Sequence, residues 1–110
     1  MAMSSKEWKN SERRMAEKLG GERVPITGRY RGYAPDIKHE HLAIEHKFGK
    51  RIISSRIIEA LKQANATAET NGGLPIVTAE QSDGIRGSRN KELAIMEIET
   101  FLELLDKVTW

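Results

Sequence analysis

The chain has 110 residues, and its 18 lysines and arginines nearly balance 16 aspartates and glutamates, which leaves a net charge of +2. This length predicts a single domain over residues 1–110, and the 38% of hydrophobic residues allows a modest core. The absence of cysteine excludes disulfides, thiolate nucleophiles and cysteine-ligated zinc. Because no apolar run is long enough to span a bilayer and the first ten residues lack the apolar segment of a secretory signal, we expect a soluble intracellular protein.

The charge is divided unevenly along the chain. Residues 1–58 contain 13 Lys/Arg and 7 Asp/Glu, a net charge of +6, whereas residues 59–110 contain 5 and 9, a net charge of −4. Clustered cations, rather than the total charge, set the local field. The first half is therefore a candidate for binding a polyanion, with an asymmetric solvated surface as the alternative.

The first predicted element is a helix over residues 4–19. Ser4 and Glu7 form a capping box at its start, and Gly20-Gly21 ends it. A short strand is expected around Arg23–Ile26, within a segment rich in Gly, Arg and Tyr that extends to Tyr33.

Two strands are predicted next, Ala34–His39 and Leu42–Phe48, with a tight turn near Glu40-His41. The second strand alternates with period 2, so Glu45 and Lys47 leave the same face. The opposite, mostly apolar face is the expected core side: Leu42, Ile44, His46 and Phe48.

The second half begins with a helix capped by Ser54 or Ser55 and ended by Asn71-Gly72-Gly73. Leu74–Glu80 and Leu93–Ile98 are predicted strands, separated by a polar loop over residues 81–91.

Thr100 and Glu103 form another capping box, which predicts a last helix with a core stripe of Phe101, Leu104, Leu105 and Val108. The order of elements is α-β-β-β-α-β-β-α. It predicts an α/β (α+β) fold in which a small mixed sheet is flanked by helices.

The chemistry is expected around Asp36, Glu45 and Lys47. The short turn between the first pair of strands brings Asp36 close enough to sit beside Glu45. Two adjacent carboxylates repel each other unless they share a cation, and Mg²⁺ prefers such oxygen ligands. Lys47 would then stand next to a metal-bound water or a developing phosphate charge.

Glu12 is anomalous because its helical position falls among the apolar residues Trp8, Met15, Ala16 and Leu19. A carboxylate at that position costs several kcal/mol unless it is paired or binds a metal. A salt bridge with an arginine at the edge of the core is the alternative to a metal site.

Pro35-Asp36 followed by Glu45-His46-Lys47 resembles the signature of the PD-(D/E)XK nuclease superfamily. Ser11-Glu12-Arg13 is similar to the first motif of its Holliday junction resolvase branch, although Lys9-Asn10-Ser11 stands where that branch often carries a glycine. The later helix and strand resemble small phage-encoded members of the branch. The resemblance implies a restriction-endonuclease-like core and a protein that acts in the cytoplasm of a bacterial host.

By that resemblance, the chain would be a Mg²⁺-dependent endonuclease, with Mn²⁺ as a substitute, that resolves four-way DNA junctions during recombination by phosphodiester hydrolysis. Asp36 and Glu45 would bind the metal together with the backbone carbonyl of His46. Glu12 would complete the metal site directly or through a water, and Lys47 would orient the attacking water. Two symmetric cuts in a junction imply a homodimer. The alternatives are a related nuclease for flap, nicked or linear DNA, and a non-catalytic DNA-binding module on the same fold.

DNA contacts are expected from cations and an interleaved tyrosine around this site: Arg13, Arg29, Tyr30, Arg31, Lys50, Arg51 and Arg56. His39 and His41 form an H-x-H pair of a kind that zinc sites use. No third ligand lies nearby in the sequence, so we expect structural or surface roles for both.

Overall fold

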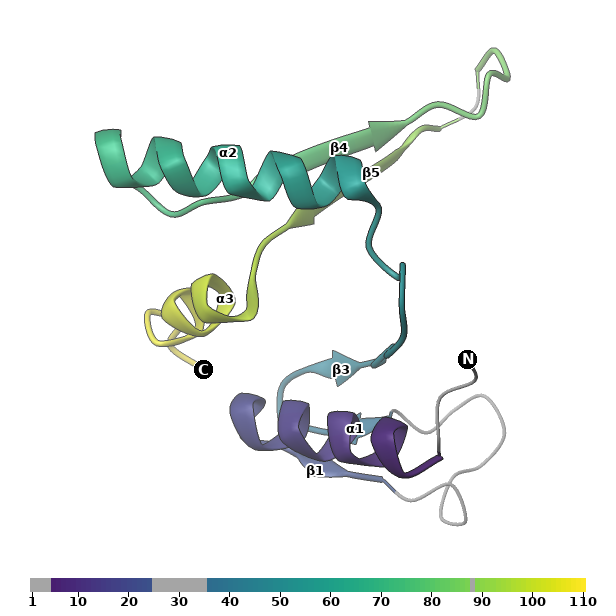
Figure 1. Ribbon diagram of the computed structural model, residues 1–110, viewed down its shortest axis with the longest axis vertical. Coiled ribbons are helices and arrows are strands. Elements are labelled where there is room, and N and C mark those ends of the chain that lie inside the picture. The colour runs from purple at the N-terminus through teal and green to yellow at the C-terminus, as the bar shows by residue number, and fades with distance from the viewer. Residues whose placement is uncertain (1–4, 25–35, 88) are drawn as a thin grey trace. The chain divides into compact units, whose positions relative to one another are not determined.

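The computed structural model describes residues 5–24, 36–87 and 89–110 (Figure 1). The elements follow the predicted order: α1 (Ser5–Leu19), β1 (Glu22–Arg23), β2 (Ile37–Lys38), β3 (Ala43–Ile44), α2 (Ser55–Asn71), β4 (Val77–Gln81), β5 (Lys91–Ile95) and α3 (Ile98–Leu105). They belong to two compact units, Met1–Ile52 together with Trp110, and Ile53–Thr109. No helix in the described ranges is both long and apolar enough to cross a membrane.

Helix α1 buries one face and ends as predicted. Its buried side chains are Ser11, Glu12, Ala16 and Leu19, which share one side of the helix. Gly20 adopts a left-handed φ of 74°, and the amide of Gly21 donates to the carbonyl of Ala16 at 2.8 Å. This is the Schellman pattern, which ends a helix most easily at a glycine. The predicted cap, Ser4, lies outside the described residues.

The first sheet has the order β1-β2-β3, and both of its strand pairs are antiparallel. β2 is the central strand, and its Ile37 is 0% exposed. Gly21 makes the approach of α1 to this strand possible, because a Cβ at that position would lie 2.5 Å from the carbonyl oxygen of Lys38. The end of the predicted strand at Ile26 and the beginning of the next at Ala34 lie outside the described residues.

Helix α2 opens the second unit and begins where a serine cap was expected. Ser54 is the N-cap residue, and its Oγ accepts a hydrogen bond from the amide of Ile57 at 3.3 Å. At the other end, the amide of Gly72 donates to the carbonyl of Ala68 at 2.8 Å. Both predicted boundaries are confirmed, but no residue of α2 is fully buried.

β4 and β5 form an antiparallel hairpin of five paired positions, from Val77 opposite Ile95 to Gln81 opposite Lys91. The predicted loop is confirmed between Gln81 and Lys91, and each strand is shifted by a few residues from its predicted bounds. Every strand pair in the described part of the chain is antiparallel, in two separate sheets. The single mixed sheet of the prediction is thus replaced there by two separate antiparallel sheets. In the first of them, the four residues 39–42 join β2 directly to β3, a connection that only antiparallel neighbours allow.

Helix α3 begins at Ile98, so the predicted start at Thr100 is wrong. Glu97 is the N-cap residue and makes no side-chain cap bond. Its carboxylate instead accepts a 2.7 Å hydrogen bond from the side-chain amide of Asn65 in α2. Thr100 is buried inside the helix, where it cannot act as the cap, and Val108 lies exposed beyond the helix end.

Candidate functional site

Asp36 is held by three hydrogen bonds at the start of the central strand. Its amide donates to the carbonyl of Ile44 at 3.1 Å, and its own carbonyl accepts from the amide of Val24 at 3.0 Å. Its side-chain Oδ2 accepts from the amide of His46 at 2.7 Å. Asp36 is also buried, so both its backbone and its carboxylate have defined positions.

These bonds place Asp36 beside Glu45. One bond goes to Ile44, the residue before Glu45, and another goes to His46, the residue after it. The side-chain bond also explains why β3 ends at Ile44 rather than at Phe48, because the amide of His46 is used by a carboxylate instead of by a backbone carbonyl.

The predicted faces of residues 42–48 are confirmed. Glu45 and Lys47 are exposed, whereas the residues between them and on either side are half-buried: Leu42, Ile44, His46 and Phe48. Glu45 and Lys47 thus present a carboxylate and an ammonium to solvent, two residues apart along the chain.

Glu12 is fully buried, which confirms its predicted position in the apolar face of α1. Its Oε1 accepts from the Nε of Arg23 at 2.7 Å, and the guanidinium carbon of Arg23 lies 5.9 Å from the centre of the Trp8 ring. The salt bridge considered as the alternative is therefore present. The role of Glu12 as a metal ligand stays a prediction.

A second polar contact joins α1 to the chain just after β3. Ser11 Oγ and His46 Nε2 are 2.7 Å apart, and Ser11 is buried. His46 therefore contacts Asp36 through its amide and Ser11 through its ring. Sequence reasoning expected a packed His46 but missed Ser11 as its partner and Arg23 as the partner of Glu12. Adjacent Ser11 and Glu12 on the buried face of one helix were the available signal.

The histidine pair is explained by the turn between β2 and β3. His39 Nδ1 accepts from the amides of His41 and Leu42, at 3.0 and 3.1 Å. The ring of His41 stacks on Trp110, which groups with this unit, with ring centres 4.2 Å apart. These contacts fit the expected structural role. Within residues 5–24, 36–87 and 89–110, no group of three or more His, Cys, Asp or Glu side chains is arranged to hold a metal ion.

The predicted DNA-binding cations are exposed wherever they are described: Arg13, Lys50, Arg51 and Arg56. Arg51 has a left-handed φ of 61°, which a non-glycine residue adopts at a cost of about 1–2 kcal/mol. Arg29, Tyr30 and Arg31 lie outside the described residues.

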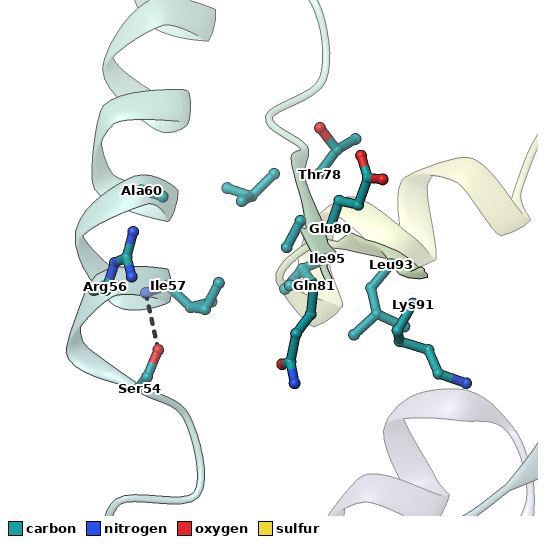
Figure 2. A pocket seen from close by; sticks show the side chains of 12 residues that line it. Ser54, Arg56, Ile57, Ala60, Thr78, Glu80, Gln81, Lys91, Leu93 and Ile95 are labelled. Carbon is teal, nitrogen blue, oxygen red and sulfur yellow. Dashed lines mark hydrogen bonds between the residues drawn. The ribbon is translucent and has the colours of Figure 1, made fainter. Parts of the chain in front are cut away.

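A groove of about 610 Å³ in the second unit lies between the first turns of α2 and the β4–β5 hairpin. Figure 2 shows Ile57 pointing from the helix toward the strands, with Arg56 on the helix and with Gln81 and Lys91 at the same end of the hairpin. The groove is lined by Ser54, Arg56, Ile57, Ala60, Val77, Thr78, Ala79, Glu80, Gln81, Lys91, Leu93 and Ile95.

No protein-family model, curated protein or solved structure matches this chain.

Proposed function

We propose that this chain is a metal-dependent DNA endonuclease of the PD-(D/E)XK type, with a restriction-endonuclease-like core, that cuts four-way junctions. The observation that carries the proposal is a pair of hydrogen bonds that brackets Glu45: the Asp36 amide donates to the carbonyl of Ile44, and the Asp36 carboxylate accepts from the amide of His46. It brings two acidic residues together at one end of a three-stranded sheet, with Lys47 two residues further along.

The donor set of this site suits a hard divalent cation. Asp36 and Glu45 supply carboxylate oxygens, and the carbonyl of His46 is the third candidate ligand. A bound Mg²⁺ would lower the pKa of a coordinated water and offset the negative charge that develops on the phosphate. The bond from the His46 amide orients the Asp36 carboxylate before any metal arrives, and preorganised ligands bind more tightly.

Lys47 is the group proposed to contact the reacting phosphate. Its ammonium is exposed beside Glu45, so it can donate to a phosphate oxygen or to the attacking water. Arg23 and Glu12 are proposed to stabilise the sheet that carries this site, because their ion pair joins α1 to β1 next to the central strand.

Cleavage of a DNA panel tests the proposal. Four-way, flap, nicked and linear substrates are incubated with the full chain at equal salt, with Mg²⁺, with Mn²⁺ and with EDTA. We expect metal-dependent cuts, fastest on the four-way junction. Glu45→Gln and Asp36→Asn should reduce cleavage below detection, and Lys47→Ala should slow it on the order of 10²- to 10³-fold.

Glu40→Gln and Lys38→Ala are the matched controls, because both residues are exposed in the same hairpin. They should cut at the wild-type rate. Circular dichroism of every variant separates lost chemistry from lost folding. Absence of cleavage on all substrates, or full activity of Glu45→Gln, would refute the nuclease proposal, whereas salt-dependent binding without products would favour the non-catalytic DNA-binding module.

A twofold dimer belongs to the same proposal. Resolving a four-way junction needs two symmetric cuts, and one chain carries one set of Asp36, Glu45 and Lys47. Light scattering during size-exclusion chromatography, with and without a junction, should give a protein mass that corresponds to two chains. A monomer in both conditions would instead favour an enzyme that cuts one strand of flap or nicked DNA.

A further inference from the structure

The loop of the β4–β5 hairpin presents an apolar side chain to solvent. Ile85 is 67% exposed, the highest value among the large hydrophobic side chains in the described part of the chain. Burying an isoleucine is worth about 1.5–3 kcal/mol, and this residue forgoes most of that gain. In Figure 1 the loop extends away from the helices of its own unit.

Local bonds shape the loop on the side that precedes Ile85. The amide of Ile85 donates to Asp83 Oδ1 at 2.8 Å, and the amide of Gly84 donates to Ser82 Oγ at 3.1 Å. Gly84 and Gly87 both adopt left-handed φ angles, of 76° and 84°. Ile85 is therefore displayed by a turn with its own hydrogen bonds.

Positive charge gathers around this isoleucine although its unit is acidic. Residues 53–109 contain six Lys/Arg and nine Asp/Glu, a net charge of −3. Half of those cations lie within six positions of Ile85: Arg86, Arg89 and Lys91. The same span contains two acids, Glu80 and Asp83, so its net charge is +1; Glu80 accepts from the side-chain amide of Asn90, and Asp83 is engaged in the turn. The field at the loop is thus opposite in sign to that of the unit as a whole.

We propose that this hairpin loop is a second DNA-contact element, in which Arg86, Arg89 and Lys91 bind phosphates and Ile85 packs against bases at the branch point. The inference rests on the proposed function, because it takes branched DNA as the substrate. A two-stranded ribbon fits a DNA groove, and isoleucine is among the apolar residues that wedge between base steps. Bases at a branch are already partly unstacked, so the wedge costs less there than in a continuous duplex.

An acidic protein surface would also attract the three cations. DNA is favoured because an exposed isoleucine followed by three cations matches a polyanion that carries stacked bases between its two charged backbones. The two roles are separable by experiment, since the cations would act on all DNA and Ile85 would act mainly at branches.

Binding of the full chain to a four-way junction and to a linear duplex of equal length tests the inference. The triple variant Arg86→Ala/Arg89→Ala/Lys91→Ala should weaken binding to both DNAs by about tenfold or more at 0.1 M salt, and should make the slope of log Kd against log salt shallower by about 2 to 3. Ile85→Ser should weaken junction binding by about fivefold or more and leave duplex binding within about twofold.

Lys62→Ala/Lys107→Ala is the matched control, because both lysines are exposed in the same unit but lie outside the loop. It should leave the slope within about 0.5 of the wild-type value, and thermal melts should show that all variants fold. Wild-type affinity and slope in the triple variant, or an equal loss on junction and duplex in Ile85→Ser, would overturn the inference. If wild type cuts the junction while the triple variant binds normally, this inference fails and the nuclease proposal stands; if wild type neither binds nor cuts DNA, the proposed function has failed first.

Discussion

The two compact units of this chain are built from different kinds of contact. In the first unit, three of the buried side chains that the structure describes are polar or charged: Ser11, Glu12 and Asp36. In the second unit, Thr100 alone among the described residues is buried, and α2 presents only half-buried or exposed side chains. Hydrogen bonds and ion pairs have preferred directions, whereas apolar contact does not.

This difference bears on where a site can be built. A catalytic constellation must be held within fractions of an ångström, which requires side chains whose positions are set by directional bonds. Asp36, Arg23 and His46 meet that condition in the first unit. The second unit instead offers an apolar groove and a cationic loop, features that suit binding better than positioning of reacting groups.

The largest expected effect on stability is that of Arg23→Ala. The change removes the guanidinium 2.7 Å from the fully buried carboxylate of Glu12, and breaking a buried ion pair from one side costs about 3–5 kcal/mol. Denaturant unfolding of the full chain gives the free-energy loss. Native-state hydrogen exchange should show that the variant, relative to wild type, exchanges faster in α1 and β2, with a smaller increase in the β4–β5 hairpin.

Arg14→Ala is the control, since Arg14 is an exposed arginine on the same helix. It should change stability by less than about 0.5 kcal/mol. An equal loss in both variants would mean that the buried pair contributes nothing particular to the first unit.

Gly21→Ala is expected to come next. The new Cβ would lie 2.5 Å from the backbone oxygen of Lys38 and 2.9 Å from Ile37, so α1 or β2 must shift, at a cost of about 1–3 kcal/mol. Gly73→Ala in the second unit is the matched change, because that glycine has a left-handed φ of 93° but no atom within 4 Å. Gly73→Ala should lower the free energy of unfolding by about 1 kcal/mol. Thermal melts of both variants then compare the cost of a steric clash, at Gly21, with the cost of backbone strain alone, at Gly73.

Ser54→Ala tests a local contact in the second unit. Loss of the hydroxyl that accepts from the Ile57 amide should cost about 1 kcal/mol, as N-cap replacements generally do. Circular dichroism during thermal unfolding measures the change. Ser55→Ala, one residue into the helix, should be nearly neutral, and the reverse order of the two effects would show that the helix begins one residue later.

Features that depend on neighbouring residues were predictable from the sequence. The cap at Ser54, the glycine end of α1 and the burial of Glu12 each follow from side-chain chemistry or helical period within one element. The order of elements and the solvent face of Glu45 and Lys47 follow from similar patterns.

The features that were missed depend on residues far apart in the chain. Arg23 pairs with Glu12 because the Gly20-Gly21 turn returns β1 along α1, and Ser11 meets His46 across 35 positions. The predicted start of α3 at Thr100 failed for a related reason, since Asn65 of α2 binds the carboxylate of Glu97. Periodicity shows which side of an element is buried, but it does not identify the partner residue.

The smallest expected effect is that of Leu93→Thr. Leu93 lines the apolar groove but is 54% exposed, so little buried area is lost and the change in stability should be below about 0.5 kcal/mol. Ile37→Val, at the fully buried core position of the first unit, should cost about 0.5–1.5 kcal/mol although it removes only one methylene. Denaturant unfolding at two protein concentrations measures both losses and shows whether either of them depends on association between chains. Leu93→Thr could instead lose more stability than Ile37→Val, by an amount that grows with protein concentration. That result would mean that a second copy of the chain covers the groove and that the second unit completes its apolar packing in the dimer.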